Sequence, residues 1–309
     1  MDNSIEPLHA VSAPHVPIMV SEIAEHLAID QKDIILDGTL GYGGHAQSLI
    51  RKLGTKGHYI GLDQDETAIT YCRDLLSDFQ KKTSPKLTLV QRNFSESNSI
   101  LSDLNIDSVD KILLDLGISS LQIDDPARGF SYTQPGPLDM RMDTSQELTA
   151  ANILSSYNAK ELSDIFFHFG ELRHNKKLVD AIISTRKKIN ISHSDQLIEL
   201  IKKSYFFHNK RSLFMKTCAQ VFQALRIAVN DELGVLNSFL ENLDLILAPN
   251  GRIAILSFHS LEDRIVKHFF RDQKSLFKPV FKGILKASQE EVSVNSRSKS
   301  AKLRCYYKL

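Results

Sequence analysis

The stretch ILDGTLGYGGHAQSLI, residues 35–50, has the pattern of a strand, a tight loop and a helix. The apolar run ends at an acid, Asp37, and four glycines follow within seven positions. Glycines in such a loop let the backbone come close to a ligand. The ligand could be a phosphate, a dinucleotide or another adenosine-bearing cofactor, and the spacing of the glycines distinguishes between these.

The glycine spacing disfavours the first two ligands. A phosphate-binding P-loop ends in Gly-Lys-Ser or Gly-Lys-Thr, whereas Gly43 is followed by Gly44 and His45. A dinucleotide fingerprint requires G-x-G-x-x-G at the start of the helix, and GTLGYGG does not fit. The loop does fit the acid–Gly–x–x–Gly–x–Gly pattern of S-adenosylmethionine-dependent methyltransferases. The alternative is a tight turn that binds no ligand.

Apolar segments before and after this loop predict a doubly wound, mostly parallel, Rossmann-like α/β sheet. Short apolar strands alternate with helical patterns, which is typical of parallel sheets with both faces covered. We expect strands at 33–38, 57–65, 86–94 and within 107–120, and helices at 45–54 and 66–80.

The alternation then stops and resumes. Residues 121–143 form a long loop rich in Pro, Gly and Asp, and loops of that length are usually functional or disordered. Only helical patterns follow up to residue 216. We therefore divide the chain into an α/β core, 1–140 and 217–309, and an inserted all-helical subdomain, 141–216. In the second part of the core we expect one long helix at 220–247, a turn at 248–251, a strand at 252–258, a helix at 260–272 and an edge strand at 303–309.

The net charge of +1 conceals an uneven distribution. Residues 151–216 carry 12 Lys and Arg against 6 Asp and Glu, and residues 264–309 carry 12 against 3. The remainder is acidic. Two basic segments on an acidic body indicate a surface that faces a polyanion, although solvated helix faces and a basic tail would give the same charges.

Composition also indicates the cellular compartment of the protein. No apolar stretch is long enough to cross a membrane, and the first 15 residues do not resemble a signal peptide. The three cysteines are scattered without a C-x-x-C pair, so we expect no metal site, no disulfide framework and a reducing cytoplasm.

Two acids stand where predicted strands end. Asp63 follows the second strand, where a carboxylate can accept hydrogen bonds from both hydroxyl groups of a ribose. Because NAD and S-adenosylmethionine both carry that diol, Asp63 does not separate them. Asp115 ends the fourth strand, where amino-methyltransferases present an acid and a turn to the target amine.

Seven motifs together resemble one family, the bacterial 16S ribosomal RNA (cytosine-N(4)) methyltransferases, known as RsmH or MraW. The resemblance runs from His15 to about Arg304, with Val221 in place of a threonine and a short region before the last motif. The motifs are HVPIMVSEI (15–23), DGTLGYGGH (37–45), LLDLGISSLQIDDPARGFSY (113–132), GPLDMRMD (136–143), FQALRIAVNDEL (222–233), SFHSLEDRIVKHF (257–269) and NSRSKSAKLR (295–304).

The resemblance implies methylation of the exocyclic amine of one cytidine in the decoding region of small-subunit ribosomal RNA, at the P site. It implies S-adenosyl-L-methionine as cofactor and the small ribosomal subunit as partner, with no DNA or membrane partner; a homodimer is compatible with it. The cofactor-binding residues that it implies are Gly43, Gly44, His45, Asp63, Phe94, Asp115 and Gln122.

Further candidates have weaker support. Ser119, Asp139 and His259 are candidate catalytic residues, although Asp139 could instead form a structural ion pair with Arg141, and His259 could precede a capping box formed by Ser260 and Asp263. The candidate contacts to RNA are Arg128, Arg141, Arg186, Lys187 and Lys188.

Two other functions fit parts of the sequence. A nicotinamide-dependent oxidoreductase could use a similar sheet, but the glycine spacing and the basic insert argue against it. A non-catalytic ribosome-assembly module with a vestigial cofactor pocket would not need intact Asp63, Asp115 and Gln122.

Overall fold

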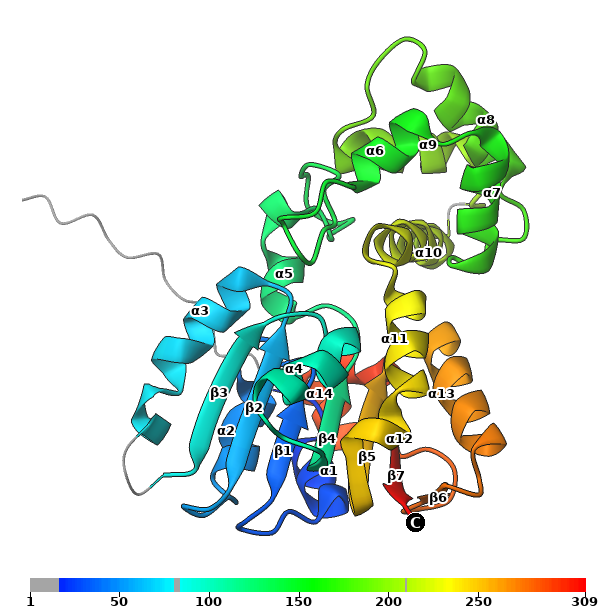
Figure 1. The fold of residues 1–309 in the computed structure, drawn as a ribbon. Coiled ribbons are helices and arrows are strands. Elements are labelled where there is room, and N and C mark those ends of the chain that lie inside the picture. Colours follow the sequence, from blue (N-terminus) through cyan, green and yellow to red (C-terminus); the bar gives the residue numbers. More distant parts are fainter. Residues whose placement is uncertain (1–16, 81–83, 209) are drawn as a thin grey trace, which may run out of the picture.

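A computed structural model describes residues 17–80, 84–208 and 210–309 (Figure 1). The N-terminal stretch that we expect not to be a signal peptide lies outside these ranges. Seven strands form one sheet in the order β3-β2-β1-β4-β5-β7-β6. The first five in this order pair in parallel, and β7 pairs antiparallel with both β5 and β6, which confirms the predicted fold class. The strands are β1 Ile34–Asp37, β2 His58–Asp63, β3 Lys86–Gln91, β4 Val109–Asp115, β5 Leu247–Ser257, β6 Phe277–Pro279 and β7 Lys302–Lys308.

Helices cover both faces of the sheet, so the central strands are buried on both sides. One apolar cluster joins one face of the strands to α1 Val20–Leu27, α2 Gly44–Ile50 and α3 Glu66–Leu75. A second cluster joins the other face to α4 Ser97–Asp103, α11 Glu232–Glu241, α12 Leu243–Ile246 and α13 Ser260–Asp272. The near-continuous apolar sequence of β4 reflects this double burial.

Five consecutive helices of the middle of the chain form a unit beyond the carboxyl ends of the parallel strands (Figure 1). They are α6 Ala150–Ser156, α7 Ala159–His168, α8 Lys176–Thr185, α9 Ser194–Ser204 and α10 Arg211–Asn230. A third apolar cluster holds them together, and it includes Phe130, Met140 and the inner face of α10. We name these helices with their shared core, residues 130–229, the helical unit. Its core therefore extends past both ends of the predicted insert, and our division at 141 and 216 stays a proposal.

Three local predictions need correction. The expected helix over 220–247 is broken at Asp231, whose φ of 46° ends α10 and starts α11, and again at Asn242. The last strand is not at the edge, because β6 pairs with its outer side. The turn at 248–251 lies within β5, where the register with β4 jumps and Asn250 has a φ of 62°.

The expected long loop after β4 is largely present, with two short helical turns in it. These are α5 Ser120–Asp124 and η3 Pro126–Arg128. Two short helical segments of the C-terminal region, α14 Gln289–Val294 and η4 Ser296–Ser300, precede β7. Within the described ranges, we find no helix with the length and apolar character needed to span a bilayer.

Candidate functional site

The Gly-rich loop after β1 folds back onto the end of β2. Leu40 donates its backbone N–H to Leu62 (2.8 Å), and Gly41 donates its own to Asp63 Oδ2 (2.7 Å). Gly41 and Gly43 have φ values of 51° and 74°, which favour glycine. A Cβ at Gly43 would lie 2.9 Å from Leu75. Gly43 thus shapes the loop from behind, whereas Gly41 and Gly44 line the cavity in front of it.

Asp37, the acid that precedes the loop, is buried beneath it. It accepts hydrogen bonds from the Tyr59 hydroxyl (2.5 Å) and the Thr39 backbone (3.1 Å). Burial raises the pKa of Asp37, although these two hydrogen bonds oppose the shift. The acid of the motif therefore supports the loop from inside the protein.

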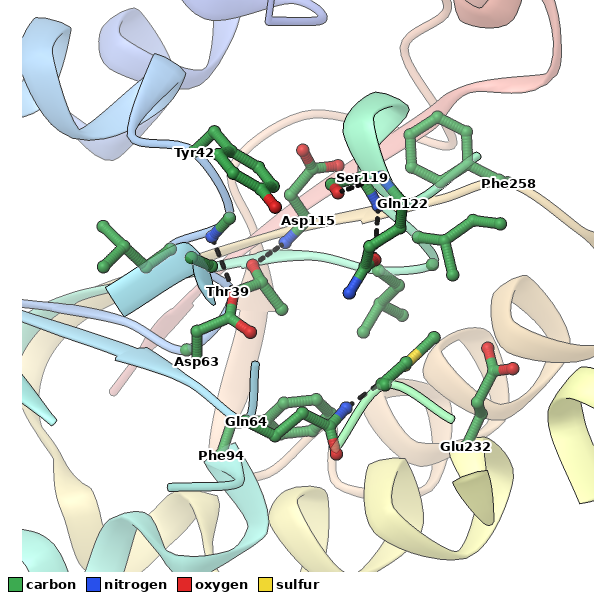
Figure 2. A pocket seen from close by; sticks show the side chains of 18 of the residues that line it. Thr39, Tyr42, Asp63, Gln64, Phe94, Asp115, Ser119, Gln122, Glu232 and Phe258 are labelled. Atoms are coloured by element: carbon green, nitrogen blue, oxygen red, sulfur yellow. Dashed lines mark hydrogen bonds between the residues drawn. The ribbon is translucent and has the colours of Figure 1, made fainter. Parts of the chain in front are cut away.

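Asp63 lies where a ribose-binding acid was predicted, at the end of β2. Its two carboxylate oxygens accept the backbone N–H groups of Gly41 (2.7 Å) and Asp65 (2.9 Å), which fixes its orientation. Figure 2 shows the side chain at one side of the cavity, below Tyr42. Burial raises the pKa of Asp63 to about 6, with the backbone hydrogen bonds compensating only in part.

Asp115 and His45 meet at the junction of β4 and α2. The Asp115 backbone N–H donates to Thr39 Oγ1 (2.6 Å), and its carboxylate lies 3.4 Å from His45 Nε2. Burial alone would lower the pKa of His45, but Asp115 and Asp37 raise it above its ordinary value. Asp115 keeps 24% of its side chain exposed toward the cavity. Its Oδ1 and the His45 Nδ1 are buried without a hydrogen-bond partner in the described ranges.

Ser119 and Gln122 form a capping box at the start of α5. The Ser119 hydroxyl accepts the Gln122 N–H (3.2 Å), and the Gln122 amide oxygen accepts the Ser119 N–H (3.0 Å). The Gln122 amide also donates to Asp65 (2.8 Å), which caps α3. Gln122 therefore joins the loops that follow β2 and β4, and both residues of the box line the cavity.

The cavity between these loops has a volume of about 350 Å³, within the range of small-molecule sites. Its lining fits S-adenosylmethionine group by group. Phe94, packed edge-on against Phe239, and Leu236 offer apolar surface for adenine. The carboxylates of Asp63 and Asp115 lie in the same lining, where they could accept ribose hydroxyls and face the positive charges of the cofactor.

Four further residues form a charge cluster in and beside the same cavity, and sequence reasoning did not identify three of them. Arg226 donates to both carboxylate oxygens of Glu232 (2.8 and 2.9 Å). Glu262 accepts the backbone N–H groups of Phe258 and His259, and its carboxylate lies 3.1 Å from His259 Nε2. Burial would raise the pKa of Glu262, but His259 and Arg226 lower it. We call Arg226, Glu232, His259 and Glu262 the charge cluster.

The charge cluster contains donor atoms at metal-binding spacing, because Glu232, His259 and Glu262 bring one ligand atom each within 4.8 Å of one another. Arg226, however, holds both oxygens of Glu232 and adds a buried positive charge. A network of ion pairs accounts for the arrangement without a cation.

His259 is at the start of α13 with its side chain 9% exposed, outside the cavity lining. It forms a capping box with Glu262. The box that we expected between Ser260 and Asp263 is wrong, because Ser260 instead donates to Glu171 of the helical unit (2.7 Å). A catalytic role for His259 stays a prediction.

Asp139 and Arg141 form a bidentate ion pair (2.9 and 2.8 Å) beside the cavity rather than in its lining. Arg141 also donates to the carbonyls of Thr144 and Gln146. The Asp139 carbonyl accepts the N–H of Ala150 at the start of α6. This geometry matches the structural alternative that we considered for the pair.

The candidate RNA contacts differ in their surroundings. Arg128 is mostly buried and donates to Asp65 (2.7 Å) and to the carbonyls of Arg141 and Met142, so its guanidinium ties the loop together. Arg186 donates to two carbonyls at the end of α6. Lys187 and Lys188 are exposed at the end of α8. Contact of any of these with RNA stays a prediction.

The chain is similar to known ribosomal RNA methyltransferases. A relative from Dictyoglomus thermophilum named "Ribosomal RNA small subunit methyltransferase H" is 39% identical over 96% of this chain and 97% of its own. A relative of the same name from Deinococcus deserti is 41% identical, over 96% and 93%. A crystal structure of an rRNA methylase from Streptococcus thermophilus superposes with a TM-score of 0.44 at 11% identity, over 94% and 93% of the two chains. That likeness is too low to bear on function.

The profile of the MraW methylase family matches residues 12–309, nearly the whole chain. This match sets aside the oxidoreductase alternative. The cavity at the carboxyl ends of β1, β2 and β4 is accordingly the candidate cofactor site, and the chain belongs to the MraW methylase family of S-adenosylmethionine-dependent methyltransferases.

Proposed function

We propose that the protein methylates the exocyclic N(4) amine of one cytidine in the decoding region of 16S ribosomal RNA, at the P site. The observation that carries the proposal is the cavity itself: the carboxylates of Asp63 and Asp115 lie in one pocket at the sheet's carboxyl edge, beside the helical unit. The relatives named as small-subunit ribosomal RNA methyltransferases support the substrate.

The residues of the cavity would hold the cofactor by separate groups. Asp63 would accept the ribose hydroxyls, Phe94 would contact the adenine, and Asp115 with His45 would lie near the methionine part. When bound, S-adenosylmethionine supplies an electrophilic methyl group on a sulfonium. The loops that follow three strands would hold the cofactor in one orientation. Holding the methyl group in line with the acceptor amine lowers the barrier to transfer.

The acceptor amine poses the harder problem, because its lone pair is delocalised into the cytosine ring. A hydrogen-bond acceptor on the amine draws that lone pair out of the ring. Asp115 keeps an unpaired oxygen at the end of β4, and Ser119 lies four residues later. Both are suited to this role, and the base must be unstacked into the cavity to reach them.

The helical unit would hold the RNA backbone. Lys176 and Lys177 at the start of α8, Lys187 and Lys188 after its end, and Lys202 and Lys203 on α9 are exposed. Such cations bind phosphates without reading sequence. The cytoplasm follows as the site of action, where small ribosomal subunits are assembled.

A mass map of small-subunit RNA tests the proposal. Subunits from cells that lack this protein should lack one methyl group on one decoding-region cytidine. Adding the purified protein and S-adenosylmethionine should restore it. A map identical with and without the protein would contradict the proposal, and a methyl group on another nucleotide would change the assigned substrate. The assembly-module alternative gains support if a variant whose cofactor site is disabled, expressed in these cells, restores the methyl group as fully as the wild-type protein does.

A further inference from the structure

Three members of the charge cluster, Arg226, Glu232 and Glu262, line the cavity, and none of them is among the residues assigned to the cofactor. Figure 2 shows Glu232 in the first turn of α11, across the cavity from Asp115 and Ser119. The cluster is not needed to hold α11 alone, since that helix is already fixed by Leu236, Phe239 and Leu240 in the core.

Within the cluster, Arg226 and Glu232 are held in one orientation. Two guanidinium nitrogens of Arg226, Nε and Nη2, donate to the two oxygens of Glu232. Glu262 lies close enough to favour the charged form of Arg226. Nη2 carries a second N–H, next to the Glu232 oxygen that it binds, and this N–H makes no hydrogen bond within the described part of the chain. Each Glu232 oxygen retains a lone pair beyond the one that Arg226 uses. The pair thus presents a donor beside an acceptor on one rigid unit.

This pattern is complementary to one edge of cytosine. Cytosine presents a donor at N(4) next to an acceptor at N3, and carboxylates commonly accept from cytosine N(4). Uracil presents the reverse, an acceptor at O4 next to a donor at N3. Against uracil, the Glu232 oxygen would face an oxygen and the second Nη2 N–H would face an N–H group, so both contacts would be repulsive.

We propose that Arg226 and Glu232 read the Watson–Crick edge of the acceptor base, with Glu232 accepting a hydrogen bond from the amine and Arg226 donating to N3. The inference rests on the proposed function, because it needs a cytosine amine as the acceptor. In this arrangement Glu232 holds one N–H of the amine while the lone pair faces the methyl group. Glu262, on α13, adds a negative charge near Arg226.

The test compares Glu232→Gln with Glu241→Gln, the same substitution at an exposed position of the same helix. Single-turnover methylation of small subunits that lack the modification should be slowed about 5- to 150-fold in Glu232→Gln, the scale of one base contact. It should change less than about twofold in Glu241→Gln. Cofactor affinity, measured by calorimetry, should stay within about threefold of wild type in both, because Glu232 faces the base.

A binding experiment distinguishes recognition of the base from a general weakening of RNA binding. Subunit RNA fragments carrying cytidine or uridine at the target position compete for the protein. The preference of wild type for cytidine should shrink in Glu232→Gln, since an amide can donate to uracil O4. If Glu232→Gln does not fold because Arg226 is left unpaired, the double variant Arg226→Gln/Glu232→Gln removes both charges and should show the same loss of preference.

Three results would overturn the inference. One is an unchanged rate and cytidine preference in a folded Glu232 variant. Another is a loss of cofactor affinity comparable to the loss of rate, which would place Glu232 against the cofactor. The third is a variant whose preference for cytidine survives although its rate falls. A wild-type protein that methylates no small-subunit RNA would instead contradict the proposed function, and cofactor calorimetry would still report on the site.

Discussion

Asp63 links cofactor binding to pH. Its carboxylate is oriented by two backbone N–H groups, and burial raises its pKa to about 6. Only the charged form can accept both ribose hydroxyls, so protonation should compete with the cofactor. The raised pKa affects folding in the opposite direction. The contribution of Asp63 to stability is fully present below its ordinary pKa of 3.8 and is lost as the pH rises through about 6.

Cofactor affinity should therefore fall about tenfold for each pH unit below 6, while the fold is not weakened by this group. Asp63→Asn should lower affinity at pH 8 by about 10- to 150-fold, the scale of a charged hydrogen bond, and flatten the pH dependence. Calorimetry between pH 5 and pH 8 measures both. Wild-type affinity in the variant would remove Asp63 from the site.

Asp139 contributes to the stability of the segment that precedes α6. Burial would raise its pKa, but the hydrogen bonds and charge of Arg141 lower it, so the ion pair stabilises the fold above the ordinary value of 3.8 and is lost as the pH falls through the lowered one. Asp139→Asn should lower the melting temperature by roughly 3–10 °C. Methylation assayed well below that temperature should persist. A stable variant whose single-turnover rate falls about 100-fold would instead establish the catalytic role.

Elements differ in how far their sequence determines them. The first four strands were predictable because their short apolar runs alternate with helical patterns. Strands β1, β2 and β4 are also largely buried, whereas β3 is only half-buried. The break at Asp231 was not, because the apolar spacing continues through it and only its left-handed conformation separates α10 from α11. The same break explains why Glu232 was missed. It lies 117 positions after Asp115, and only the packing of α11 against the sheet brings the two to one cavity.

Among the helices, α8 offers the clearest test of RNA binding. Lys187 and Lys188 after its end are exposed, whereas Arg186 is bonded to the carbonyls of Leu154 and Tyr157. Changing both lysines to Glu should weaken binding to small-subunit RNA at least about fivefold at low salt and reduce the log–log salt slope by about 1–2. Cofactor affinity should not change.

The matched control for α8 changes two exposed lysines, Lys52 and Lys56, to Glu. These two lie just before β2, at the amino ends of the parallel strands. Filter binding at several salt concentrations compares the two variants. Equal slopes in both would mean that the lysines after α8 are an ordinary solvated helix end.

At the scale of the molecule, the basic C-terminal segment is partly neutralised by the body. Five of its cations form ion pairs with acids of other elements: Arg264 with Glu171, Arg297 with Asp124, Lys302 and Arg304 with Asp263, and Lys308 with Asp244. The last four of these fasten β7 and η4 to other elements, and a linear sequence count could not identify them. Exposed lysines remain on both basic segments, such as Lys274 and Lys282 here and Lys187 and Lys188 after α8, and contact of either segment with RNA stays a prediction.

The helical unit and the cavity are joined by Asn230, the last residue of α10. Its buried amide accepts the Met142 N–H (2.7 Å) and donates to the Met140 carbonyl (2.7 Å), and it also lines the cavity. Asn230→Ala would leave these two backbone groups unpaired, at a cost of about 1–3 kcal/mol for each that stays buried. The loop that carries Met142 should then no longer be fixed over the cavity.

We expect Asn230→Ala to lower the single-turnover rate about tenfold or more, since misplacing groups around the acceptor reduces catalysis by positioning. The melting temperature should fall by several degrees, and cofactor affinity should change less than the rate because Asp63 and Gln122 are held by other contacts. Asn237→Ala is the control, because that amide bonds only to Leu233 on the exposed side of α11. If both variants keep full rate and stability, the helical unit is held over the cavity by its apolar packing and not by Asn230.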